Sequence, residues 1–173
     1  MRNFLMTTAF ACIGVFAAAT AHAGIMGDTV MIAWLYPNPG DIFSQQTATV
    51  TSAIEVTDLL WHLSVDFTDK QLILTYLDDA FYQSDPQVGP SFADQTNKFL
   101  SFTIDNTTTA SWFNSTMIDI DSSGQITMNL RTQTFHTGET VVLNLSTSVP
   151  EPAALALLGA GILGLGAARR RRN

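Results

Sequence analysis

Apolar and polar side chains alternate with a period of two through most of residues 24–148, which is the pattern of strands with one buried face. The clearest run spans residues 61–67, and its expected buried face carries Trp61, Leu63, Val65 and Phe67. Seven further runs occupy residues 28–36, 47–51, 72–77, 99–105, 116–121, 125–130 and 140–145. We therefore predict an all-β domain of about eight strands, an antiparallel β-sandwich or jelly-roll.

Residues 78–97 separate two of these runs and predict one long connection, because they include Asp85, Pro86, Gly89 and Pro90. Loops longer than about 12–15 residues tend to be functional or disordered. This segment also carries the aromatic residues Phe81, Tyr82 and Phe92. We expect them to pack the loop over one end of the domain, with ligand contact as the alternative.

The N-terminus has the pattern of a secretory signal. Arg2 precedes an apolar run, and the small residues Ala21 and Ala23 stand where a signal peptidase recognises its substrate. We predict that residues 1–23 are a signal peptide cut after Ala23. An uncleaved anchor is the alternative, but the apolar run is shorter than the roughly 20 residues of a membrane span. A lipoprotein signal at Cys12 is disfavoured because Phe10 is bulky.

Cys12 is the only cysteine of the chain, so the processed protein would contain none. It could form no disulfide, use no thiol nucleophile and build no cysteine zinc site. An exported domain of this kind must be stabilised by its hydrophobic core.

The C-terminus has three successive parts, residues 149–173 in all. It begins with Val149, Pro150, Glu151 and Pro152, continues through an apolar, glycine-rich stretch, and ends in a basic tail of Arg169, Arg170, Arg171 and Arg172. The prolines favour extended backbone. The apolar stretch would form a short transmembrane helix with the arginines kept cytoplasmic. Its glycines make that helix a weak, temporary anchor, although an ordinary membrane tail is an alternative.

These closing residues resemble the PEP-CTERM sorting signal of Gram-negative bacteria. The resemblance implies that an exosortase, a membrane-embedded cysteine protease, recognises the Pro-Glu-Pro element and removes the anchor. It also implies a precursor held briefly in the inner membrane and a final location at the cell surface or in an extracellular matrix. Many members of the family take part in biofilm and exopolysaccharide matrices, and a looser resemblance links residues 27–143 to β-rich passengers of such proteins.

Charge separates the middle of the chain from its ends. The whole chain has a formal charge of −7, but residues 24–148 carry only Lys70, Lys98 and Arg131 against fourteen carboxylates, a formal charge of −11. We therefore expect no nucleic-acid partner for this segment, because phosphate binding requires a basic face.

Candidate chemistry in the middle segment is weak. His62 and His136 are expected at the surface, and Asp66 would lie about 13 Å from His62 along one strand at roughly 3.3 Å per residue. The neighbours Asp78 and Asp79 would point to opposite sides of an extended chain, unlike the facing acids of a glycosidase. We predict no catalytic residues, no metal ligands and no cofactor.

Residues 119–126 resemble the first half of a calcium-binding loop, with Asp119 and Asp121 at alternate positions and Gly124 at the turn. Leu130 stands where a bidentate glutamate would be required. We therefore expect a β-hairpin at this point.

Aromatic rings that could stack on sugars are Trp34, Tyr36, Trp61, Tyr76 and Trp112. The alternation assigns Trp61 to the core and leaves the orientation of Trp34 and Tyr36 open. The sequence thus predicts a non-enzymatic, secreted surface or matrix protein whose partners are signal peptidase, exosortase and the inner membrane. A carbohydrate-binding module for exopolysaccharide is the alternative, and a glycan-acting hydrolase is a distant third.

Overall fold

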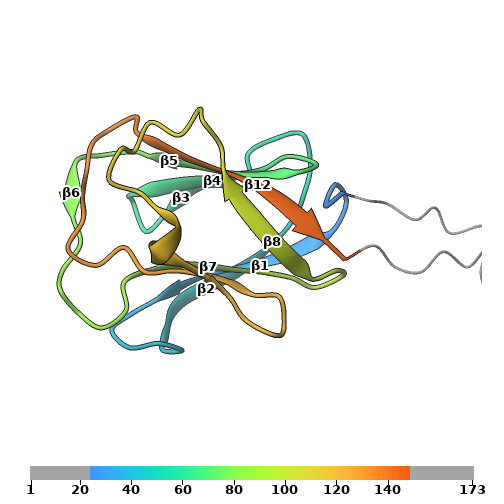
Figure 1. The fold of residues 1–173 in the computed structure, drawn as a ribbon, viewed down its shortest axis with the longest axis horizontal. Coiled ribbons are helices and arrows are strands. Elements are labelled where there is room, and N and C mark those ends of the chain that lie inside the picture. The colour runs from blue at the N-terminus through green and yellow to red at the C-terminus, as the bar shows by residue number, and fades with distance from the viewer. Residues whose placement is uncertain (1–23, 149–173) are drawn as a thin grey trace, which may run out of the picture. The chain divides into compact units, whose positions relative to one another are not determined.

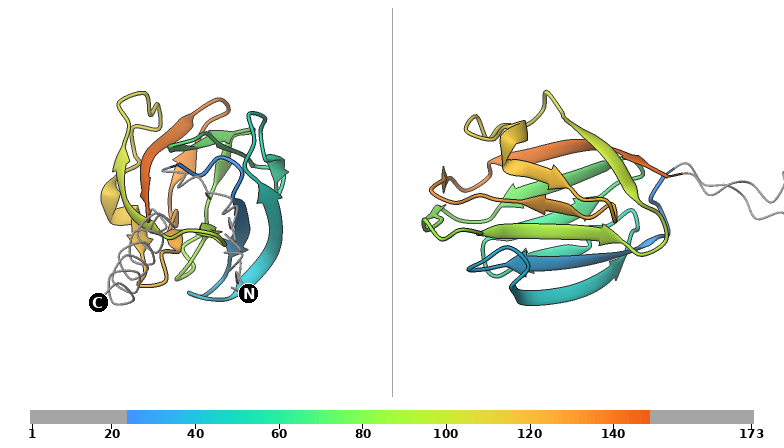
Figure 2. Two further views of the ribbon diagram at one scale, coloured as in Figure 1. Left: turned by 90° about the vertical axis from the view of Figure 1, so that its right-hand side faces the viewer. Right: turned by 60° about the horizontal axis from the view of Figure 1, so that its bottom comes forward.

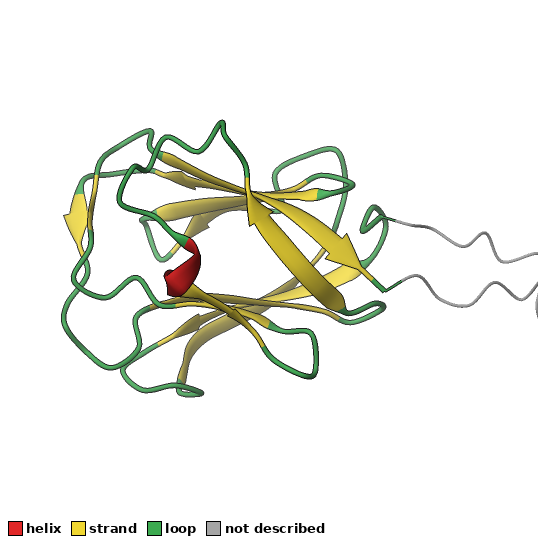
Figure 3. Ribbon diagram, in the orientation of Figure 1, coloured by secondary structure: helices red, strands yellow, loops and turns green. Residues whose placement is uncertain are grey.

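The computed structural model describes residues 24–148, which form two five-stranded antiparallel sheets and one small two-stranded sheet (Figures 1 and 3). The first sheet has the order β2 (Ile42–Thr49), β1 (Thr29–Leu35), β7 (Gly89–Asp94), β10 (Ile126–Met128) and β9 (Ile118–Ile120). The second has the order β3 (Val56–Leu59), β4 (Leu63–Phe67), β5 (Gln71–Tyr76), β12 (Thr140–Thr147) and β8 (Phe99–Ile104).

The small sheet pairs β11 (Thr134–Phe135) with β6 (Ala80–Phe81). One 3₁₀ turn, η1 (Ser115–Met117), precedes β9, and the side chain of Asn114 accepts a hydrogen bond from the backbone N–H of Thr116. Within the described chain the fold is thus all-β and antiparallel, as the alternation predicts. No helix in the part of the chain that the structure describes is long and apolar enough to cross a membrane.

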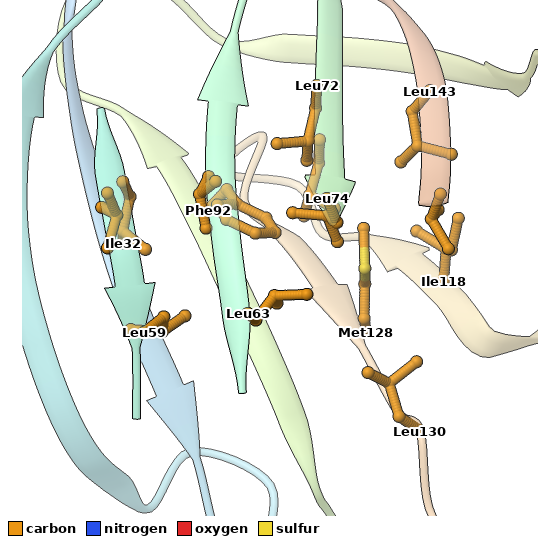
Figure 4. Packing of buried hydrophobic residues seen from close by; sticks show 14 of the residues in the cluster. Ile32, Leu59, Leu63, Leu72, Leu74, Phe92, Ile118, Met128, Leu130 and Leu143 are labelled. Atoms are coloured by element: carbon orange, nitrogen blue, oxygen red, sulfur yellow. The ribbon is translucent and has the colours of Figure 1, made fainter. Parts of the chain in front are cut away.

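The two large sheets face each other across one hydrophobic core (Figure 2). Inward side chains of β1, β7 and β10 meet those of β4, β5 and β12; Figure 4 shows several of them, including Ile32, Phe92, Leu72 and Leu143. Phe67 lies at the centre, with its ring 5.7 Å from that of Phe92 and 6.5 Å from that of Phe99. Burying these side chains provides the main stabilising term for a domain without disulfides.

The prediction of about eight strands was wrong, since the described residues form twelve. The predicted runs all contain strands, and the four additional strands are β3, β6, β7 and β11. The most consequential is β7, because it lies inside the predicted loop 78–97 and pairs with both β1 and β10. The strand was not predicted because Gly89 and Pro90 are typical of loops. Pro90 lacks an N–H, but it stands at the beginning of β7, where a proline is tolerated.

Trp61 is the second correction. Leu63, Val65 and Phe67 are fully buried, as predicted, whereas Trp61 is 79 % exposed. The reason is conformational: Leu60 and Trp61 have φ angles of 57° and 64°, so the chain turns there and β4 begins only at Leu63. A left-handed backbone breaks the alternation on which the prediction depended.

Candidate functional site

A groove of about 300 Å³ opens in the described domain where segments from both large sheets and from β6 meet. β6 lies at the end of the domain opposite to the two ends of the described chain (Figure 1). The groove is lined by Trp34, Tyr36, Phe43, Leu60, Trp61, His62, Phe81, Tyr82, Gln83 and Val88. It contains six aromatic side chains beside one histidine and one amide, and neither lysine nor arginine.

The floor of the groove is continuous with the core. Trp34, Tyr82 and Val88 are buried, and the rings of Trp34 and Tyr82 lie 5.4 Å apart at an angle of 52°. Tyr82 also contacts Phe135, with ring centroids 4.4 Å apart. Because close-packed interiors hold side chains in fixed rotamers, the floor is rigid.

The rim of the groove exposes apolar surface to water. Phe43, Trp61 and Phe81 are 64 %, 79 % and 59 % exposed, although they come from three separate segments of the chain. Phe43 is held in place by an edge-on contact with Tyr36, 6.2 Å between ring centroids. Clusters of exposed apolar side chains mark binding surfaces more often than scattered single ones do.

The turn that presents Trp61 is held by backbone hydrogen bonds. The N–H of His62 donates to the carbonyl of Leu59 at 3.3 Å, and the N–H of Leu77 donates to the carbonyl of His62 at 2.9 Å. Two consecutive non-glycine residues in the left-handed region cost roughly 1–3 kcal/mol each, and such strain concentrates at functional sites. The turn therefore fixes Trp61 outward at a cost to stability.

His62 forms a hydrogen bond with Asp78 at the side of the groove. Its Nδ1 lies 2.9 Å from both carboxylate oxygens of Asp78. A carboxylate only accepts hydrogen bonds, so Nδ1 carries the proton and the other ring nitrogen, Nε2, is an acceptor when the ring is neutral. The alternation of residues 61–67 places only Asp66 on the same strand face as His62, and it does not reveal Asp78. The register of β4 and β5, which pairs Leu63 with Tyr76, would have placed residues 62 and 78 close together.

Asp79 points to a different partner, as the extended-chain argument predicts. Its Oδ1 accepts hydrogen bonds from the backbone N–H of Thr137 at 2.6 Å and from the hydroxyl of Thr137 at 3.0 Å. The backbone hydrogen bond is the main reason why the pKa of Asp79 is lowered, and His136, 3.7 Å away, adds to the effect. A lowered pKa suits a structural carboxylate better than a general acid.

The segment that resembles a calcium loop is a hairpin. β9 and β10 pair through Ile120 and Ile126, which confirms the prediction. The carboxylate of Asp121 accepts from the N–H and hydroxyl of Ser123 and from the N–H of Gln125, and these bonds lower its pKa. A second groove, about 480 Å³ in volume and lined in part by Asp119 and Asp121, lies beside this hairpin. Within residues 24–148, no three histidine, cysteine or acidic side chains form a metal-binding group.

The remaining candidate aromatics fall into two groups. Tyr76 is buried in the core, and Trp112 is partly buried, with its Nε1 donating to Glu139 at 3.1 Å. In the predicted loop, Tyr82 and Phe92 pack inward as expected, whereas Phe81 is exposed. Phe43 was missed as a rim residue, because it lies in no predicted strand and only the tertiary fold brings it beside Phe81. For Phe81 the exposed position agrees with ligand contact, which was the alternative for the aromatics of the predicted loop.

The predicted processing residues lie outside the residues that the structure describes. They are Ala21 and Ala23 of the predicted signal peptide, Val149, Pro150, Glu151 and Pro152 of the sorting motif, and Arg169, Arg170, Arg171 and Arg172 of the basic tail. The transmembrane helix predicted between the sorting motif and the basic tail also lies outside the described residues.

Residues 148–172 match the family model of the PEP-CTERM protein-sorting motif. No curated protein and no solved structure matches the chain. The chain thus carries a PEP-CTERM sorting motif, which supports an exosortase as its processing partner and implies a membrane-anchored precursor that is processed for export.

Proposed function

We propose that this chain is a non-enzymatic protein of the cell surface or extracellular matrix, with residues 24–148 as an acidic β-sandwich passenger. The observation that carries the proposal is the sorting motif, which begins at residue 148, directly after β12 ends at Thr147. Signal peptidase would cut after Ala23, and the apolar stretch would hold the precursor in the inner membrane. An exosortase would then release the passenger.

The net charge of the passenger affects its solubility and its non-specific contacts. A formal charge of −11 on residues 24–148 keeps such a domain soluble and discourages non-specific adhesion to other polyanions. It could also collect divalent cations weakly, without a dedicated binding cage.

The geometry around His62 supports a non-enzymatic role. Asp78 orients the ring, but among the described residues no serine or threonine hydroxyl forms a hydrogen bond with its Nε2. A nucleophile activated by histidine requires such a bond. The lowered pKa of Asp79 likewise argues against a glycosidase acid. Turnover of an exopolysaccharide by the purified protein, lost in Asp78→Asn, would replace this proposal with the hydrolase.

A carbohydrate-binding module is the second candidate. The observation that favours it is the convergence of Phe43, Trp61 and Phe81 on one groove. Exposed aromatic rings with a few polar groups at their edges are typical of sites that bind flat, partly apolar ligands.

Sorting can be tested with two variants in cells that contain an exosortase, Glu151→Ala and a deletion of Arg169 to Arg172. Both should accumulate uncleaved precursor in the membrane fraction on immunoblots. Asp58→Ala, which removes an exposed carboxylate far from the motif in sequence, is the matched control and should mature normally. Normal maturation of both sorting variants would contradict exosortase processing.

A further inference from the structure

We propose that the aromatic groove binds a neutral polysaccharide, with Trp61, Phe43 and Phe81 as the surfaces on which sugar rings stack. This inference rests on the proposed function, which places the passenger outside the cell. It goes further in naming the site, its residues and the charge class of the ligand.

The shape and lining of the groove suit a sugar ring. A pyranose presents apolar C–H faces bordered by hydroxyl groups, so it needs apolar platforms and hydrogen-bonding partners at their margins. The rim supplies exposed aromatic side chains, and His62 and Gln83 supply polar groups within the same lining. At about 300 Å³ the groove is at the small end of ligand sites and would hold roughly one or two sugar rings.

The polar groups of the groove are available to a ligand. His62 uses Nδ1 to contact Asp78, which fixes the ring, and none of the hydrogen bonds of the described residues involves Nε2. The side-chain amide of Gln83 likewise has no hydrogen-bond partner among the described residues. Together they offer an acceptor and an amide that can both donate and accept, which complements sugar hydroxyls.

The negative charge of the domain favours a neutral polymer over an anionic one. The groove has no lysine or arginine in its lining, and it belongs to a segment with a formal charge of −11. A uronic-acid polymer or a nucleic acid would be repelled without any compensating cation. A neutral polymer meets no such penalty.

The site is also built in advance of binding. Trp34 and Tyr82 form a packed floor, and the left-handed turn at Leu60 and Trp61 holds the most exposed indole of the domain at the rim. A ligand that stacks there requires no rearrangement of the backbone turn or of the packed floor, which favours binding. β6, which contributes Phe81, lies away from the ends of the described chain, so attachment through the C-terminus is at the opposite end of the domain (Figure 1).

Binding can be measured with the full chain reconstituted in phospholipid nanodiscs, so that the assay does not depend on sorting. The probes are dextran, mannan and xyloglucan as neutral polymers and polygalacturonate as the anionic one, applied to immobilised nanodiscs in biolayer interferometry. We expect at least one neutral polymer to bind and polygalacturonate to bind at least tenfold more weakly. Trp61→Ala should weaken neutral-polymer binding at least tenfold, and Trp61→Tyr should retain most of it.

Leu100→Ala is the matched control, because Leu100 is a large exposed apolar residue on β8 outside the groove. Polymer binding by this variant should stay within twofold of wild type.

If circular dichroism shows that Trp61→Ala does not fold, Phe43→Ala and Phe81→Ala take its place with the same expected loss of binding. Absence of binding to every neutral polymer, equal binding to polygalacturonate, or unchanged binding in the groove variants would overturn the proposal. So would a Trp61-dependent dimer without polymer binding, which would assign the groove to a second copy. None of these binding results would bear on exosortase sorting. A failure of the sorting test would likewise leave the binding measurements unchanged, so the two proposals can fail independently.

Discussion

Phe92 provides a direct test of the fold, because it lies in the segment that the sequence predicts to be a loop. In the structure Phe92 is fully buried on β7, pairs with Ile32 on one side and Ile126 on the other, and places its ring edge-on to Phe67. Phe92→Ala would remove a ring from the centre of the core and leave a cavity. Such changes cost about 3–5 kcal/mol of unfolding free energy.

The measurement is urea unfolding of the fragment 24–148, which contains every residue of the described core. With an m-value of about 2 kcal/mol/M, the midpoint should fall by roughly 1.5–2.5 M urea without a change in m. Phe81→Ala is the matched control, because it removes the same ring from the same segment at a 59 % exposed position. Its effect should stay within about 0.5 kcal/mol. Small and equal effects of the two substitutions would show that residues 78–97 form a loop and that β7 does not exist.

Two further predictions concern strain and pH. Trp61→Gly should stabilise the fragment by up to about 1 kcal/mol in urea unfolding, because glycine adopts the left-handed conformation without a Cβ penalty. The same substitution should abolish neutral-polymer binding. A lower stability of the variant would show that the turn is not strained. Burial raises the pKa of Asp94, whose Oδ2 is buried without a hydrogen-bond partner, and the nearby Asp28 adds to the shift. A raised folded-state pKa contributes stability that is present below the ordinary value of 3.8 and is lost as pH rises through the folded pKa. Asp94→Asn should therefore be more stable than wild type at pH 7, with the difference disappearing towards pH 3 in thermal unfolding; a difference that is independent of pH would contradict this.

The alternation of apolar residues predicted what depends on local pattern. Leu63, Val65 and Phe67 are buried as expected, and the β9–β10 hairpin follows from the turn residues after Asp121. The groove depends on features that the pattern does not contain. The outward orientation of Trp61 results from a left-handed turn, and the contact of His62 with Asp78 depends on the pairing of β4 with β5.

The processing of the C-terminus tests the central claim most directly. Mass spectrometry of the protein recovered from exosortase-containing cells should find chains that end before Arg169, and cells without the exosortase should retain chains that end at Asn173. Recovery of only chains ending at Asn173 from cells that possess the enzyme would contradict the claim that this is a sorted and released passenger.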